Sequence, residues 1–394
     1  MQVRLPAADG SLQPYKLHGP GSFTPARPGA KLTRIAYSAA HVVADARAAI
    51  DPWLDCAIDW DSTLAYRRRL WSMGLGVAEA MDTAQRGMGL DWPTSLELIR
   101  RSIDAARDMP GASLASGCGT DQLAPEAAHS VDDVIRAYEE QMAAIEALGG
   151  RLILMASRAL ARVAQGPADY ERVYDRVLSQ AREPVILHWL GDMFDPALKG
   201  YWGSADTRAA MDTALGIIAA HASRVDGIKI SLLDKAQEIT MRRRLPPGVR
   251  MYTGDDFNYA ELIAGDGVGT HATQRHSDAL LGIFDAIAPA ASAALAALAA
   301  GDEARFHAIL APTVPLSRHI FRAPTRFYKT GVVFMAWING HQGHFVMVGG
   351  QQSTRSLPHL CELFRLADAA GLIEDPELAV ARMKHLLAMH GVDA

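Results

Sequence analysis

One lysine lies inside a short apolar segment, and this combination can supply a nucleophile. Lys229 occurs in Val-Asp-Gly-Ile-Lys-Ile-Ser, which has the composition of a buried strand. Burying an ammonium costs several kcal/mol, so a buried lysine either loses its proton or finds a carboxylate partner. Desolvation lowers the pKa of the amine, and a neutral amine can form a Schiff base with a carbonyl compound. The alternative is a structural lysine paired with Asp226 or Asp256.

Three other apolar runs also end in polar side chains. In parallel βα units the carboxyl ends of the strands meet at one mouth, where catalytic residues gather. A histidine there suits proton transfer near neutral pH, whereas an aspartate before a helix is equally well explained as a helix cap. The polar residues that end the runs 184–190, 249–253 and 267–271 are His188, Asp255, Asp256, Thr270 and His271.

The elements that must position these residues alternate regularly along the chain. Apolar runs typical of strands are separated by segments with helical periodicity, among them 94–108, 131–148, 168–182, 205–223 and 256–264. Eight strands in βα alternation predict an α/β fold of the (β/α)₈ TIM-barrel type. The predicted strands are 34–38, 75–81, 112–116, 151–156, 184–190, 226–230, 249–253 and 267–271.

Segments on both sides of this pattern extend beyond a barrel. Residues 1–33 are rich in Pro and Gly and predict an N-terminal arm or a short hairpin. We expect the barrel to occupy 34–285, followed by a helical extension over 286–394 that packs on it. The Ala-rich stretch 288–300 has high helix propensity and belongs to that extension. The pattern of 331–350 assigns no element, and His341 and His344 within it have no predicted role.

Composition bounds the possible partners and the compartment. Apolar residues make up 49% and charged residues 21% of the 394 residues, with a formal charge of −5, so no basic footprint for nucleic acid is present. No apolar run is long enough to span a membrane. The three cysteines are widely spaced and odd in number, which is typical of the reducing cytoplasm. We therefore expect a cytoplasmic protein that binds a small molecule.

The second half of the chain resembles the dihydrodipicolinate synthase and N-acetylneuraminate lyase superfamily of class I aldolases. Three motifs occur in the order typical of that family: Gly227-Ile228-Lys229, then 253–256 (Thr-Gly-Asp-Asp), then the glycine-rich 265–269. The resemblance covers roughly residues 34–330 and is weaker in the first half. It implies a TIM barrel, a Schiff-base role for Lys229 and association into a homodimer or homotetramer.

The departures from that family are informative too. Where the family has a proton-relaying tyrosine after the fifth strand, this chain has His188. The turn that holds a 2-keto acid carboxylate in the family corresponds here to residues 81–85. In it Thr83 keeps a hydroxyl and Gln85 a polar group, but Asp82 would repel a substrate carboxylate. On the fourth strand a pair of tyrosines is replaced by Ser157 and Arg158, and the arginine offers an anion site.

These residues predict a lyase that acts on a small polyhydroxylated carbonyl compound, such as a keto sugar or sugar acid. Lys229 would form the imine, His188 would move the proton, and Asp82 with Thr83 would orient hydroxyl groups. Retro-aldol cleavage and dehydration share the imine step. Substrate contacts are expected from Asp82, Gln85, Arg158, Asp255, Thr270 and His271.

Two alternatives remain open from the sequence. A metal-dependent lyase or isomerase would need carboxylates and imidazoles to converge at the mouth, yet no HxH, HExxH or CxxC spacing supports a metal. The other alternative is a ligand-binding barrel without catalysis. We therefore expect no metal. We also expect no dinucleotide cofactor, because the glycines at 265–269 lack the remaining features of a dinucleotide site. The residues considered as metal ligands are His41, Glu79, Asp82, His188 and His271.

Overall fold

Eight parallel strands close into a barrel, as the sequence predicts. The computed structural model describes residues 1–7, 9–82 and 85–393. Around the barrel the strands follow the order β10-β3-β4-β5-β6-β7-β8-β9, so neighbours in space are neighbours in sequence except where β10 meets β3. The strands are β3 (Ala36–Ala39), β4 (Gly76–Glu79), β5 (Leu114–Cys118), β6 (Leu152–Leu154), β7 (Val185–Leu190), β8 (Val225–Ser231), β9 (Arg250–Thr253) and β10 (Asp278–Leu281).

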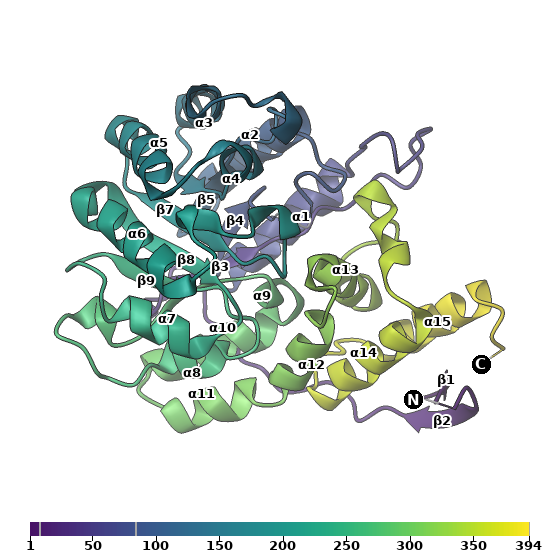
Figure 1. Cartoon of the computed structure of the whole chain (residues 1–394). Helices are drawn as coiled ribbons and strands as arrows, with labels where there is room; N and C mark the ends of the chain where they lie inside the picture. Colours follow the sequence, from purple (N-terminus) through teal and green to yellow (C-terminus); the bar gives the residue numbers. More distant parts are fainter. Residues whose placement is uncertain (8, 83–84, 394) are drawn as a thin grey trace.

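Helices join successive strands and surround the barrel (Figure 1). The helical segments predicted from periodicity all correspond to helices of this outer layer. Further helices follow β10, and they include the predicted Ala-rich helix. The outer layer contains α1 (Trp60–Ser72), α2 (Trp92–Arg107), α3 (Val131–Ala147), α4 (Arg158–Val163), α5 (Pro167–Gln180), α6 (Thr207–Ala220), α7 (Lys235–Arg242), α8 (Tyr259–Ala264), α9 (Ile283–Ala286) and α10 (Ala288–Ala299).

The last predicted strand, 267–271, is wrong, because this segment is a loop. Gly265, Gly267 and Gly269 all have positive φ, which ends any extended run. The side chain of Gln274 holds the loop by accepting hydrogen bonds from backbone N–H groups at 2.9 and 3.2 Å. The strand that closes the barrel is instead β10, a short apolar segment that lies within the predicted barrel range 34–285 but in none of the predicted strands.

Two tyrosines fill the interior of the barrel, and two glycines make room for them. The rings of Tyr37 and Tyr252 lie 6.2 Å apart among buried aliphatic side chains. A Cβ on Gly76 would come within 2.7 Å of the Tyr37 ring, and one on Gly227 within 2.7 Å of the Tyr252 ring. Gly227 of the Gly-Ile-Lys motif is therefore a packing requirement of the strand that carries the lysine.

The N-terminal arm and the C-terminal helices pack together (Figure 1). The arm begins as a hairpin of β1 (Gln2–Pro6) and β2 (Leu12–Lys16), and Tyr15 donates a 2.7 Å hydrogen bond to Asp368. None of the helices in the described part of the chain is both long and apolar enough to cross a membrane. The C-terminal helices are α11 (Glu303–Leu310), α12 (Thr313–Ile320), α13 (Tyr328–Ile338), α14 (Leu357–Ala369) and α15 (Pro376–Met389).

Candidate active site

Lys229 and His188 are lateral neighbours in the barrel. The parallel register of β7 and β8 pairs the two residues directly, and both side chains line the same small internal chamber. Burial lowers the pKa of the Lys229 amine, although the carboxylates of Asp256 and Asp82 oppose that drop. Burial, and next the charge of Lys229, hold the pKa of His188 well below its ordinary range. The imidazole is therefore neutral at physiological pH, the form that accepts a proton.

Two carboxylates from other strands line the chamber with the lysine, Asp256 and Asp82. Asp82 is described below. Asp256 follows β9, lines the chamber and accepts a 2.9 Å hydrogen bond from the backbone N–H of Ile283. Burial raises the pKa of this carboxyl group, while the Ile283 N–H and the charge of Lys229 oppose the rise. The neighbouring Asp255, predicted to contact substrate, instead caps the following turn by accepting hydrogen bonds from the backbone of residues 257 and 258. Of these two neighbouring aspartates, Asp256 is the one in the chamber.

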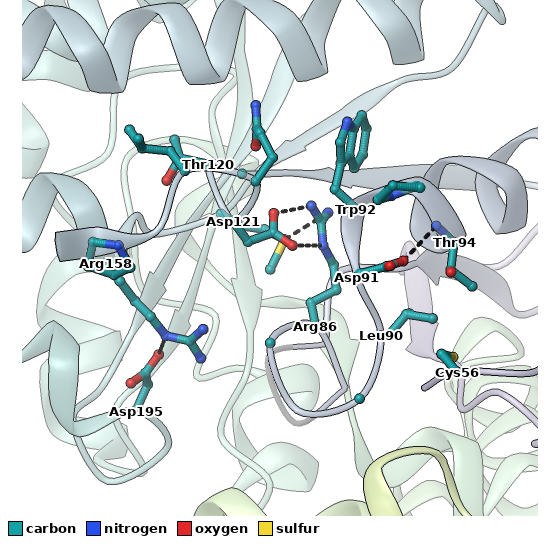
Figure 2. A pocket seen from close by; sticks show the side chains of 18 of the residues that line it. Cys56, Arg86, Leu90, Asp91, Trp92, Thr94, Thr120, Asp121, Arg158 and Asp195 are labelled. Carbon is teal, nitrogen blue, oxygen red and sulfur yellow. Dashed lines mark hydrogen bonds and ion pairs between the residues drawn. The ribbon is translucent and has the colours of Figure 1, made fainter. Parts of the chain in front are cut away.

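Arg158 and Gln85 lie outside this chamber. Arg158 begins α4 and forms an ion pair with Asp195 at 2.5 Å, at the edge of a separate, larger cavity (Figure 2). Gln85 is buried, and its backbone N–H donates a 2.9 Å hydrogen bond to the carbonyl oxygen of Asp82. Thr83, predicted to be catalytic, lies outside the described residues.

Thr270 and His271 do not reach the lysine either. Because residues 267–271 form a loop between α8 and β10 and not a strand, neither side chain is among the described residues that line the chamber. Thr270 is exposed and His271 is partly exposed. Their selection followed from the misplaced strand.

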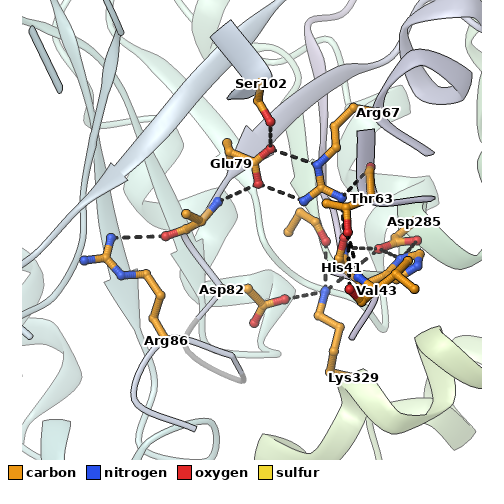
Figure 3. A network of polar contacts seen from close by, with 12 residues as sticks. His41, Val43, Thr63, Arg67, Glu79, Asp82, Arg86, Ser102, Asp285 and Lys329 are labelled. Atoms are coloured by element: carbon orange, nitrogen blue, oxygen red, sulfur yellow. Dashed lines mark hydrogen bonds and ion pairs between the residues drawn. The ribbon is translucent and has the colours of Figure 1, made fainter. Parts of the chain in front are cut away.

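Asp82 is held by two residues of the C-terminal helix α13, and Figure 3 shows one of them, Lys329. The amine of Lys329 lies 2.5 Å from Asp82, and the hydroxyl of Tyr328 donates a short hydrogen bond to the same carboxylate. Lys329 also donates to the carbonyl oxygen of Ala39 at 2.9 Å. Burial, and next the charge of Asp82, raise the pKa of Tyr328 well above its ordinary value, so this phenol keeps its proton. Asp82 thus carries a compensated negative charge at the chamber wall.

The residues considered as metal ligands have other partners. Glu79 forms a two-point ion pair with Arg67 at 2.8 and 2.9 Å, and both side chains are fully buried. His41 places Nδ1 2.9 Å from the carboxylate of Asp285 and Nε2 3.2 Å from Gln342 (Figure 3). Within residues 1–7, 9–82 and 85–393, no three His, Cys, Asp or Glu side chains are grouped closely enough to hold a metal ion.

Several residues of the site were missed by sequence reasoning, above all Tyr328, which lines the chamber, and Lys329, which forms an ion pair with Asp82. A related signal was present in the sequence. Lys329 is a lysine next to the apolar run 331–338, whereas Lys229 lies inside an apolar run. Ser231 also faces the chamber, because it lies two residues beyond Lys229 on the same side of β8, with Oγ 3.5 Å from Nε2 of His188. Among the residues that the structure describes, the chamber is lined by Met81, Asp82, His188, Leu190, Phe194, Lys229, Ser231, Asp256, Gly282 and Tyr328.

The fold of this chain resembles several solved structures of dihydrodipicolinate synthases and their relatives. Dihydrodipicolinate synthase from Cyanidioschyzon merolae with lysine bound aligns with TM-score 0.63 and 13% identity over 87% of this chain and 100% of that one. The Acinetobacter baumannii dihydrodipicolinate synthase complexed with pyruvate gives TM-score 0.62 and 14% identity over 86% and 99%. YagE, a prophage protein of the dihydrodipicolinic acid synthase family from E. coli K12 in complex with pyruvate, gives 0.61 and 14% over 92% and 100%.

At these identities the similarity establishes the fold, and the predicted resemblance to dihydrodipicolinate synthases is confirmed at that level. No curated protein matches the chain in sequence. Residues 3–392 match the family described as "Protein of unknown function (DUF993)". The chain therefore belongs to that family, whose profile covers the arm, the barrel and the C-terminal helices alike.

Proposed function

We propose that this protein is a Schiff-base-forming lyase acting on a small polyhydroxylated carbonyl compound such as a keto sugar or sugar acid. The observation that carries the proposal is the Lys229 amine, buried in a chamber beside a neutral imidazole and two carboxylates. Pyruvate, bound by two of the structural relatives, is itself a small carbonyl compound. The barrel fold alone supports many chemistries, so the argument rests on the site.

The first steps use the lysine. Its neutral Nζ adds to the substrate carbonyl carbon, and loss of water leaves an iminium that withdraws electrons from the adjacent carbon. Asp256 and Asp82 lie close enough for their charges to act on the lysine, and they would stabilise the iminium cation in the same way.

The later steps use the proton acceptor and the donor. His188 removes the proton from the hydroxyl on the β-carbon, the bond between the α- and β-carbons breaks, and its electron pair moves to the iminium nitrogen to give an enamine. For dehydration, His188 removes the α-proton first to give the enamine, and it then returns that proton to the β-hydroxyl, which departs as water and leaves an unsaturated iminium. Tyr328 is a candidate donor to a substrate oxygen, because it keeps its proton and lines the chamber.

The test is reductive trapping of the imine. Incubation with borohydride and a panel of keto sugars is expected to add the mass of the reduced ligand to the peptide that contains Lys229. Lys229→Met should abolish labelling and turnover, whereas Lys235→Met, at an exposed lysine on α7, should leave both intact. Full turnover by Lys229→Met, lost on treatment with a chelator, would overturn the proposal in favour of metal-dependent chemistry. Saturable sugar binding without turnover at any pH would instead indicate a ligand-binding barrel.

A further inference from the structure

The chamber around Lys229 is too small to hold a substrate alone. Its volume is about 10 Å³, which is roughly the space for the centre of one water molecule. A cavity of about 1040 Å³ lies over the ends of β4, β5 and β6, lined by residues from the loops that follow these strands (Figure 2). Cavities of this size enclose small-molecule ligands in proteins.

One methionine lines each of the two spaces, Met81 the small chamber and Met155 the outer cavity. Nζ of Lys229 lies 4.0 Å from Sδ of Met81, and the guanidinium of Arg86, in the outer cavity, lies 3.6 Å from Sδ of Met155. Both methionines pack against Gly117, where a Cβ would lie 2.6 Å from the Cα of Met81 and 2.8 Å from Sδ of Met155. Methionine side chains are unbranched and adapt readily, so both can move to admit a ligand.

A second segment also joins the two spaces. Phe194 lines the chamber and the next residue, Asp195, lines the outer cavity. The loop after β7 therefore contributes to both. Asp82 likewise lines the chamber, and Arg86, whose backbone N–H donates to the carbonyl oxygen of Asp82 at 2.9 Å, lines the cavity. A ligand with its carbonyl at Lys229 has the outer cavity as the adjoining volume for its remaining atoms.

The charges in the outer cavity limit what those atoms can be. Its two arginines are already paired, Arg86 with Asp121 and Arg158 with Asp195 (Figure 2). Asp91, which caps α2, and Asp55 also line it, so among the described lining residues four aspartates face two arginines. This excess of negative charge disfavours a phosphate or carboxylate, whereas hydroxyl and amino groups can donate hydrogen bonds to the carboxylates.

We propose that the outer cavity binds the distal part of the substrate, and that this part carries hydroxyl or amino groups and no phosphate or carboxylate. The inference rests on the proposed function for its chemistry. Binding of the distal part in the outer cavity does not require an imine and can be measured without one.

The variant that tests this inference is Thr94→Trp, which places a large side chain in the outer cavity. Thr94 lines the cavity from the first turn of α2. Its backbone N–H donates a 2.9 Å hydrogen bond to the capping carboxylate of Asp91, and the substitution leaves this N–H in place. The matched control is Thr213→Trp on α6, at a surface position that belongs to neither cavity.

The first measurement is the labelling of Lys229 with cyanoborohydride by fructose, fructose 6-phosphate and hydroxyacetone. We expect fructose to label faster than its phosphate, and Thr94→Trp to lower the ratio of fructose to hydroxyacetone labelling about tenfold, which corresponds to about 1.4 kcal/mol. Thr213→Trp should keep the parent ratio. An unchanged ratio in Thr94→Trp, or preference for the phosphate, would overturn the inference.

The second measurement separates this inference from the proposed lyase activity. In a Lys229→Met background no imine can form, yet sorbitol, which has no carbonyl, is expected to raise the melting temperature by binding. Sorbitol also stabilises proteins by exclusion from their surface, so the shift is read against Thr213→Trp in the same background. The excess shift should vanish in Thr94→Trp. Equal shifts in both variants would contradict sugar binding in the cavity even if Lys229 proves catalytic.

Discussion

Gly254 packs against the side chain of Lys229: a Cβ placed on this glycine would lie 2.8 Å from Cε of the lysine. It would also lie 2.7 Å from the carbonyl oxygen of Ile230, which accepts a hydrogen bond from the Gly254 N–H at 2.9 Å. The Thr-Gly-Asp-Asp motif therefore includes a glycine because the turn after β9 closes directly over the lysine. The glycine of this motif and the side chain of Lys229 are therefore in direct packing contact.

Substitution of this glycine should displace the lysine. We expect Gly254→Ala to lower the free energy of unfolding by about 1–3 kcal/mol, as overpacking does, and to reduce reductive labelling of Lys229. Gly216→Ala on α6 is the control, because a Cβ there meets nothing within 4 Å and removes a helix glycine, a gain of about 0.5–1 kcal/mol. Urea unfolding and peptide mass analysis measure both quantities. Parent-like labelling in Gly254→Ala would show that the contact does not position the amine.

The barrel was predictable from sequence because its strands are short buried runs separated by amphipathic helices. Seven of the eight predicted strands overlap observed ones. The eighth predicted strand was misplaced. The residues of the observed strand, Asp278–Leu281, run directly into the apolar helix α9, and local periodicity does not separate the two elements. The glycine-rich loop before it offered a more strand-like motif, but its positive φ angles are a property of the folded chain.

The site was only partly predictable, because two residues of its polar network, Tyr328 and Lys329, come from a distant helix. Lys229 and His188 lie within neighbouring barrel strands and Asp82 follows another strand, so the barrel topology brings them together. Tyr328 reaches the chamber from α13, and it is 246 residues away in sequence from the carboxylate it contacts. No local pattern encodes such a contact, so only the conspicuous charge of Lys329 beside an apolar helix could have indicated it.

Removal of the Lys329 charge should cost far more stability than removal of an exposed one. Lys329 is fully buried between Asp82 at 2.5 Å and Asp285 at 4.0 Å, so Lys329→Met leaves buried carboxylates uncompensated. We expect a loss of about 3–5 kcal/mol in the free energy of unfolding. Lys235→Met breaks an exposed pair with Glu261 of the same 2.5 Å length and should change it by less than about 1 kcal/mol.

A double-mutant cycle distinguishes this electrostatic effect from lost packing. If the Lys329→Met penalty arises from an unpaired charge, Asp82→Asn in the same chain should recover a measurable part of it. Additive losses in the double variant would mean that the two charges do not interact, contrary to their separation in the structure.

Glu238 should make the stability of the protein fall as the pH rises. Burial raises the pKa of this carboxyl to about 8 from an ordinary value of 4.5, although the hydroxyls of Ser277 and Thr253 oppose the rise. Between these pH values the folded protein holds a proton that the unfolded chain has released, so its contribution to stability is complete below about pH 4.5 and declines toward pH 8. The slope from this group reaches about 1.4 kcal/mol per pH unit.

Urea unfolding at several pH values measures that slope. Glu238→Gln, which keeps oxygen and nitrogen atoms near both hydroxyls, should flatten the pH dependence, whereas Glu261→Gln at an exposed site on α8 should retain it. A parent-like slope in Glu238→Gln would assign the dependence to other groups.

Asp256 should set the pH at which Lys229 becomes reactive. Burial lowers the pKa of the lysine and the Asp256 carboxylate is the largest influence opposing that drop, so Asp256→Asn should lower the lysine pKa further. More of the amine is then neutral at a given pH, and the rise of reductive labelling with pH should move to lower pH. The asparagine oxygen can still accept the 2.9 Å hydrogen bond from the Ile283 N–H, which limits structural change.

Asp255→Asn is the matched control, because this neighbouring residue caps a turn and asparagine is an equally good cap. A shift to higher pH in Asp256→Asn, or the same shift in both variants, would rule out direct electrostatic control of the amine by Asp256.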